Sequence, residues 1–165
     1  MAGQMVIGFV GRVIAVMALV AVAPAGHGDA ARWEYERFTD PFERNGSVHI
    51  ASIETVDARM IVRCASPSGL PEIRIFLPRD RIDALTTVAW SFDRRREQSA
   101  PWRVSANRRS IVLPVRFSDD FIYQLRVRSA LTVTVVSGQE AMPPVQFPLT
   151  GSSVAIFKAL NACGR

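Results

Sequence analysis

The stretch TVAWSF, residues 87–92, decides the fold of this chain. Val88, Trp90 and Phe92 occupy every second position, and small or polar residues stand between them. Successive side chains of a strand point to opposite faces of a sheet, so this period of two predicts a strand with one apolar face. We therefore expect these three large side chains to lie in a hydrophobic core.

The same alternation recurs along the chain, in short runs separated by turn residues. This is the pattern of half-buried strands in an all-β domain. The run from Leu125 to Val135 is long enough to predict either one bent strand or two. The residues that these runs place on one face of a strand are Ile73, Ile75 and Leu77; Ile111, Leu113 and Val115; and Leu125, Val127, Ser129, Leu131, Val133 and Val135.

Turn residues and prolines indicate how the strands are connected. Residues 47–55 and 59–64 flank a short turn and predict a hairpin. Residues 145–149 return as a strand whose outward positions include Pro144 and Pro148. Proline cannot donate a hydrogen bond to a neighbouring strand, so this strand is expected at the edge of a sheet.

Two segments depart from the strand pattern and predict helices. A serine and two aspartates at 118–120 suit the cap and first turn of a short helix through Leu125. Near the C-terminus, Ile156, Ala159, Leu160 and Cys163 recur with helical spacing, and a serine at 152 or 153 is expected to cap the start of that helix. Together the patterns predict a mainly β chain, folded as a single β-sandwich-like antiparallel domain with a short internal helix and a C-terminal α-helix.

The first 25 residues have the features of a signal peptide. Arg12 gives a positive flank, residues 13–23 are an unbroken apolar run, and small residues at 23–25 suit a signal peptidase. A membrane span would instead bury Arg12 at a cost of about 2.5 to 3.5 kcal/mol. We predict cleavage near residue 25, no transmembrane anchor afterwards, and one domain over residues 26–165, periplasmic or secreted. The chain has one lysine, Lys158, among its 20 basic residues, which suggests a bacterial gene rich in GC.

Cys64 and Cys163 are the two cysteines of the chain. In an oxidising compartment such a pair predicts one disulfide. The bond would close a loop of about 100 residues, for which the chain-entropy model gives about 4.7 kcal/mol. A metal site is the alternative, but two thiols without a histidine nearby in sequence lack a recognisable ligand set.

Groups able to carry out catalysis are scarce. The chain contains no nucleophile elbow, no zinc-binding H-E-x-x-H and no glycine-rich phosphate loop. The carboxylate pairs Asp119 with Asp120 and Asp80 with Asp83 are interpreted as a helix start and a solvated loop. We predict a protein that is not an enzyme and that uses no cofactor or metal. The alternative is a small hydrolase in which His49 works with an aspartate.

Arginines gather between Asp93 and Ser110. The candidate anion-binding residues are Arg94, Arg95, Arg96, Trp102, Arg103, Arg108 and Arg109. They could hold an anionic envelope polymer through bidentate contacts and stacking, whereas an exported protein rarely meets nucleic acid. The interpretation that we favour is a solvated hairpin loop with Trp102 folded back on the sheet, because runs of charge are usually exposed faces.

Several pieces of the chain resemble one known family. They are the strand MIVRC (60–64), the segment VAWSFD (88–93), Trp102 with Ser105, residues 121–128, and the tail from FPLTG (147–151) to ACG (162–164). Together they resemble the TagO/VasI-like family of small exported proteins associated with type VI secretion. The resemblance covers most of the mature chain. It implies a periplasmic accessory or binding protein without known catalytic residues, whose partner is an envelope or secretion-system protein.

Overall fold

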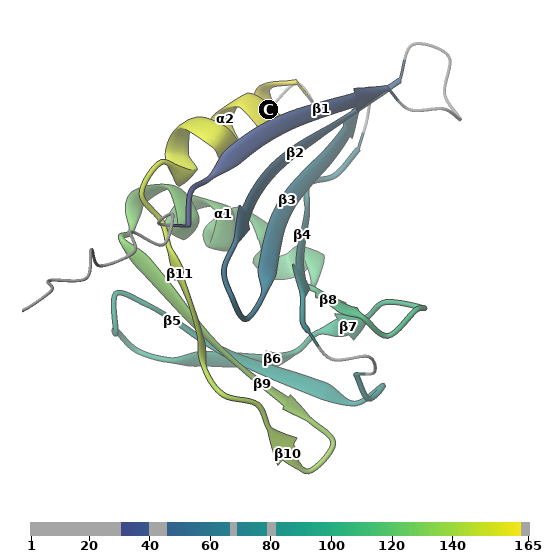
Figure 1. Cartoon of the computed structure of the whole chain (residues 1–165), viewed down its shortest axis with the longest axis vertical. Coiled ribbons are helices and arrows are strands. Elements are labelled where there is room, and N and C mark those ends of the chain that lie inside the picture. Colours follow the sequence, from purple (N-terminus) through teal and green to yellow (C-terminus); the bar gives the residue numbers. More distant parts are fainter. Residues whose placement is uncertain (1–30, 40–45, 67–68, 79–81, 163–165) are drawn as a thin grey trace, which may run out of the picture.

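Two antiparallel sheets and two α-helices make up the fold. The computed structural model describes residues 31–39, 46–66, 69–78 and 82–162. Figure 1 shows the two sheets one below the other, with the helices at one side. This confirms the predicted mainly β, sandwich-like domain with a short internal helix and a C-terminal helix.

The first sheet, sheet A, has six strands in the order β1-β2-β3-β4-β8-β7. The second, sheet B, has five strands: β10, β9, β5 and β6 follow one another, and β11 also pairs with β9. Sheet A is formed by β1 (Glu34–Thr39), β2 (Ser47–Glu54), β3 (Arg59–Ser66), β4 (Glu72–Phe76), β7 (Arg103–Val104) and β8 (Ser110–Val112). Sheet B is formed by β5 (Thr86–Phe92), β6 (Gln98–Pro101), β9 (Ala130–Ser137), β10 (Glu140–Ala141) and β11 (Val145–Pro148).

Three helical segments complete the domain: η1 (Val115–Phe117), α1 (Ser118–Val127) and α2 (Ser152–Asn161). The C-terminal helix α2 packs across β1, β2 and β3 and also touches α1 (Figure 1). Ser152 joins the two helices, because its buried Oγ lies 2.6 Å from the carbonyl oxygens of both Leu125 and Leu149. No helix within the described ranges is long and apolar enough to cross a membrane.

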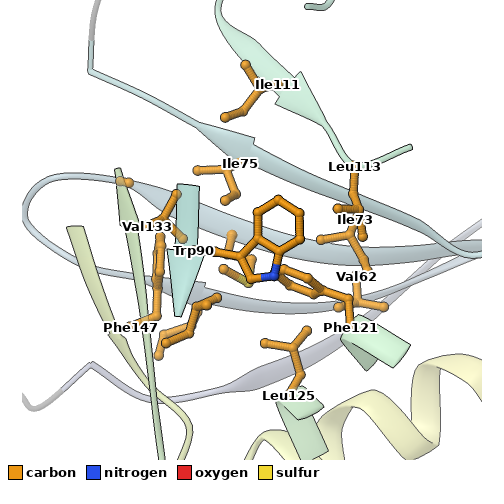
Figure 2. Close-up of a cluster of buried hydrophobic side chains, with 14 of the residues drawn as sticks. Val62, Ile73, Ile75, Trp90, Ile111, Leu113, Phe121, Leu125, Val133 and Phe147 are labelled. Carbon is orange, nitrogen blue, oxygen red and sulfur yellow. The ribbon is translucent and has the colours of Figure 1, made fainter. Parts of the chain in front are cut away.

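The core lies between the sheets and is centred on aromatic rings. Trp90 is 3% exposed and makes edge-to-face contacts with Trp102, Phe117 and Phe121 at centroid distances of 5.6 to 6.0 Å. Figure 2 shows Trp90 among aliphatic side chains from both sheets and from α1. Val88, Trp90 and Phe92 are all buried, so the alternation in residues 87–92 is confirmed as one core face.

The connections predicted from turns and prolines are also confirmed. Strands β2 and β3 form a continuous hairpin in which Ser47 lies opposite Ser66 and Glu54 opposite Arg59. Strand β11 pairs with β9 through residues 145–148, and among the described strands it has no second neighbour. Pro148 is the last residue of β11, where a missing N–H interrupts no ladder.

The long alternation from Leu125 to Val135 does not form one strand or two. Residues 118–127 are the helix α1, which is longer than predicted, and the strand β9 begins at Ala130. Leu125 fits both periods, since it lies two residues from Val127 and four residues from the fully buried Phe121. The helical stripe buries three large side chains, those of Phe121, Ile122 and Leu125, whereas Val127 is 52% exposed. Burial of the stripe therefore decides the local structure.

Two further local predictions are wrong. Val115 is 65% exposed because the strand ends at Val112, and Pro114 leads the chain into η1. The predicted serine cap of the C-terminal helix is replaced by Gly151, which adopts a left-handed conformation with φ of 86°. Ser152 instead begins the helix and ties its first turn to α1.

Candidate binding cleft

A cleft of about 550 Å³ opens where the edge of sheet B passes into the edge of sheet A. Three chain segments line it, namely residues 70–72, 101–103 and 112–115. They are distant in sequence and meet because β7, β8 and β4 are neighbours in sheet A. Pockets of a few hundred Å³ or more are the usual size for binding small molecules and short segments.

Prolines shape the walls of the cleft. Pro101 ends β6, and one residue later the chain enters sheet A as β7. Pro114 follows β8 in the same way, and Pro71 precedes β4. Because proline has a fixed φ and no N–H, these three residues end or precede strands and present rigid apolar rings to the cleft.

Trp102 lines the cleft at the point where the chain passes from β6 in sheet B to β7 in sheet A. Its backbone N–H donates to the Thr86 carbonyl oxygen at 3.1 Å, and its ring packs edge-on against Trp90 and Phe121. The side chain is 3% exposed, so the predicted folding of Trp102 back onto the sheet is confirmed.

The indole N–H of Trp102 has no acceptor among the described residues. Among the described residues, Ser110 Oγ is the one other buried side-chain nitrogen or oxygen atom without a hydrogen-bond partner. A buried donor without a partner costs about 1 to 3 kcal/mol, so such groups are uncommon in folded proteins.

Charged groups lie at the rim of the cleft. Glu72 accepts hydrogen bonds from Nε and Nη2 of Arg74 at 3.1 and 2.8 Å. Arg103 lies farther away, with its Nη2 3.7 Å from the second Glu72 oxygen, and its side chain is 75% exposed. Two guanidinium groups thus face one carboxylate, and Arg103 is the more loosely held of the two.

A larger groove of about 1090 Å³ runs between β1 and α2. Its buried donor already has a partner, because the Trp33 indole N–H donates to the Pro148 carbonyl oxygen at 3.0 Å. Trp102 differs from Trp33 in this respect, because its indole N–H has no acceptor among the described residues.

The structure does not bring the predicted arginines together in one loop. Arg94, Arg95 and Arg96 lie exposed in the turn after β5, while Arg108 and Arg109 lie in the turn between β7 and β8. The Arg108 carbonyl oxygen accepts from Ile82 N, which precedes β5. The two groups of arginines therefore lie toward opposite ends of β5, and Figure 1 shows the two turns on opposite sides of the view. The strand β5 spans about 20 Å, at 3.3 Å per residue. Only Arg103 and Trp102 reach the cleft.

His49 lies in β2 and is 5% exposed, beneath the C-terminal helix. Tyr35 Oη is 2.8 Å from its Nδ1, and Ser47 Oγ is 2.7 Å from its Nε2. Both ring nitrogens are thus engaged by hydroxyl groups and not by the aspartate that the hydrolase alternative requires. Burial lowers the pKa of His49, and the guanidinium of Arg37, opposite it on β1, lowers the pKa further.

We expect this burial to make folding sensitive to acid. A histidine with a lowered pKa in the folded state binds its proton more readily when unfolded, so stability is full above about pH 6.5 and falls as the pH drops below it. The slope from one proton is at most about 1.4 kcal/mol per pH unit. Urea titrations between pH 5 and pH 7 should show this decline in the wild type and a smaller one in His49→Gln. Equal slopes would contradict the prediction.

The other predicted site residues lie apart from the cleft. Asp119 and Asp120 occupy the first turn of α1, as expected, and Asp83 donates its backbone N–H to Ser137 Oγ, while Asp80 lies outside the described residues. Among the described residues, no group of three His, Cys, Asp or Glu side chains could hold a metal ion.

Cys64 is fully buried on β3, directly opposite His49. No described cysteine is free. Cys163 and the predicted signal peptide, residues 1–25, lie outside the described residues. The disulfide and the cleavage site therefore stay predictions.

The fold is a β-sandwich-like domain with a proline-walled cleft at the junction of its sheets. The chain matches no protein-family model, and it has no significant match among curated proteins or solved structures. Sequence reasoning singled out Trp102 but missed the cleft. The available signal was the position of Pro71, Pro101 and Pro114 beside strand ends.

Proposed function

We propose that this chain is an exported, non-enzymatic interaction protein of the bacterial envelope that binds a partner in the cleft at Trp102. The observation that carries the proposal is an open cleft of about 550 Å³ whose walls include three prolines and whose lining includes the charged residues Glu72 and Arg103. The apolar leader and the cysteine pair support an oxidising, extracytoplasmic location. The resemblance to the TagO/VasI-like family supports an envelope or secretion-system protein as the partner.

The composition of the cleft favours binding over catalysis. Its described lining contains no serine, threonine, cysteine, histidine or lysine, so no nucleophile and base can be paired there. Its charged side chains, those of Glu72 and Arg103, are suited to orienting a ligand. Binding of an anionic envelope polymer has less support, because the arginines proposed for it are divided between two turns.

Site-specific crosslinking in the periplasm tests the proposal. A photoreactive residue in place of Val115, a 65% exposed residue of the cleft, is expected to capture one protein partner. The matched control is the same substitution at Val127 on α1, which is 52% exposed and lines neither the cleft nor the groove between β1 and α2. We expect the Val115 adduct alone, in the periplasmic fraction, on a chain that begins near residue 26.

Two outcomes would overturn the proposal. One is equal capture from Val115 and Val127, because a specific site should favour the first. The other is an uncut chain in the cytoplasm, which would remove the proposed location.

A further inference from the structure

We infer that the groove between β1 and α2 binds an extended peptide as an added strand on the outer edge of sheet A. The peptide carries basic, apolar, basic, apolar and acidic residues in succession, and it runs antiparallel to β1, as β2 does on the other side. This site is separate from the cleft at Trp102, and the inference does not depend on the proposed function.

The edge of β1 that faces away from β2 is unpaired. Strand β1 is the first of sheet A, and β2 is its one neighbour among the described strands (Figure 1). In an antiparallel pair, every second residue turns its N–H and C=O away from the partner strand. Within the described part of the chain, no main-chain group of β1 bonds to backbone outside the ladder with β2. These donors and acceptors are available to an added strand.

The groove follows this edge and not one face of the strand. Every residue from 31 to 36 lines the groove, although neighbouring side chains of a strand point to opposite faces. A groove on one face would be lined by every second residue. The volume of about 1090 Å³ exceeds the roughly 300 to 1000 Å³ usual for small-molecule sites, so there is room for a peptide. The wall across from β1 is formed by Pro148, Thr150, Gly151, Val154, Ala155 and Lys158.

One side of the added strand would face α2 and is expected to be apolar. Tyr35 points to this side, because its Oη lies 2.8 Å from Nδ1 of His49 beneath the helix. Lys158 Nζ lies 6.0 Å from the Tyr35 ring and so covers it from α2. Val154, which is 62% exposed, and Ala155 line the groove from the same helix. A β-branched side chain such as valine would bury the exposed surface of Val154.

The other side of the added strand would lie beside three charged residues. Glu34 and Glu36 alternate with Tyr35 and therefore lie on the face of sheet A away from α2, and Arg32 lies two residues before the strand begins. None of the three forms an ion pair with another described residue. Opposite charges on neighbouring strands stabilise a sheet, and like charges destabilise it. An antiparallel strand would match Glu36, Glu34 and Arg32 with a basic, a basic and an acidic residue.

The same charges disfavour a second copy of this chain in the groove. Two identical strands that pair antiparallel about a twofold axis place one residue opposite itself. Centring the pair on Glu34, Glu36 or Arg37 therefore places equal charges opposite each other. Centring it on Tyr35 places Glu34 opposite Glu36. Each of these registers is unfavourable, so the occupant is a different chain.

Two peptides test this arrangement by NMR titration of the ¹⁵N-labelled mature chain at millimolar concentration. The probe is acetyl-Lys-Val-Lys-Val-Glu-amide. The control is acetyl-Glu-Val-Glu-Val-Glu-amide, which matches one of the three charges in either direction. We expect the probe to shift the amide signals of residues 31–36 and to bind at least about fivefold more tightly. The chain has 20 basic and 15 acidic residues, so attraction by its net charge would favour the control instead.

Reversing the two carboxylates tests the role of the charges. In the double variant Glu34→Lys with Glu36→Lys, all three charges are positive and match the control peptide. The order of the two affinities should therefore reverse. Neither glutamate is buried or ion-paired within the described chain, so this variant is expected to fold, and its amide spectrum checks this. If it does not fold, the measurements on the wild type still decide.

Methylation of alternate amides of the probe tests whether the main chain pairs with β1. One methylated peptide carries the methyl groups on its two valines, and the other carries them on its charged residues. Only one of these sets of N–H groups would face β1. We expect one methylated peptide to lose binding and the other to keep it.

Three results would overturn the inference. Equal affinity of the probe and the control for the wild type would remove the assigned charges. Binding of both methylated peptides would show that no strand is added. Absence of shifts at residues 31–36 with the probe would show that the groove takes no such peptide. The crosslink from Val115 tests the proposed function separately, so failure of one does not imply failure of the other.

Discussion

Replacing Phe121 with alanine is expected to lower the free energy of unfolding by about 3 to 5 kcal/mol. Phe121 is 2% exposed and makes edge-to-face contacts with Trp90, Phe92 and Trp102 at centroid distances of 5.2 to 6.0 Å. It is the side chain through which α1 is held in the aromatic core. Its removal would leave a cavity bordered by rings from β5 and by Trp102, which cannot move without disturbing both sheets.

Urea unfolding followed by tryptophan fluorescence measures this effect, because Trp90 and Trp102 adjoin the substituted side chain. Tyr123→Ala is the matched control, since Tyr123 lies two residues along the same helix and is 60% exposed. The control should change stability by less than about 0.5 kcal/mol. A loss below about 1 kcal/mol in Phe121→Ala would show that the site collapses freely and that the aromatic cluster is not a rigid core.

Reduction of the predicted Cys64–Cys163 disulfide is expected to cost about 2 to 5 kcal/mol of stability. The described part of the fold supports this pairing. Cys64 lies opposite His49 on sheet A, and α2 packs over β1, β2 and β3 with its last residue, Asn161, two positions before Cys163. The bond would tie a helix of 10 residues to the sheet, and helices of that length are marginal without tertiary support.

Mass spectrometry after alkylation under denaturing conditions comes first, and it should find no reactive thiol in the oxidised protein. Urea titrations with and without a reducing agent then measure the loss of stability. The double variant Cys64→Ser with Cys163→Ser is the control, because it should respond equally in both conditions. Two alkylated thiols in protein purified from the periplasm would refute the disulfide.

The strands were predictable because their signal is local. In residues 87–92 and in Ile73 with Ile75, each core side chain is two positions from the next, and the faces observed agree with that period. The two errors have different causes. Leu125 fits a period of two, but it belongs to a helical stripe with Phe121, so the strand begins only at Ala130. Val115 continues the alternation of β8 in the sequence, but Pro114 comes before it and leads the chain into η1.

The sites were less predictable, because they combine residues that are remote in sequence. His49 was correctly expected in a strand, but its partners Tyr35 and Ser47 follow from the register of β1 and β2 and the burial beneath α2. The arginines looked like one cluster because they are close in sequence. The strands β6 and β7 separate them.

By itself, the sequence determined the class of fold, the hairpin of β2 and β3, and the burial of Trp102, since side-chain periodicity and turn residues act over a few positions. Only the tertiary structure decided that residues 70–72, 101–103 and 112–115 meet around a cleft. The physical reason is the order of strands in sheet A, where β4, β8 and β7 are neighbours although more than 25 residues separate β4 from β7 in the chain. The unpartnered N–H of Trp102 follows from that meeting, because it depends on which acceptors the folded chain brings within reach.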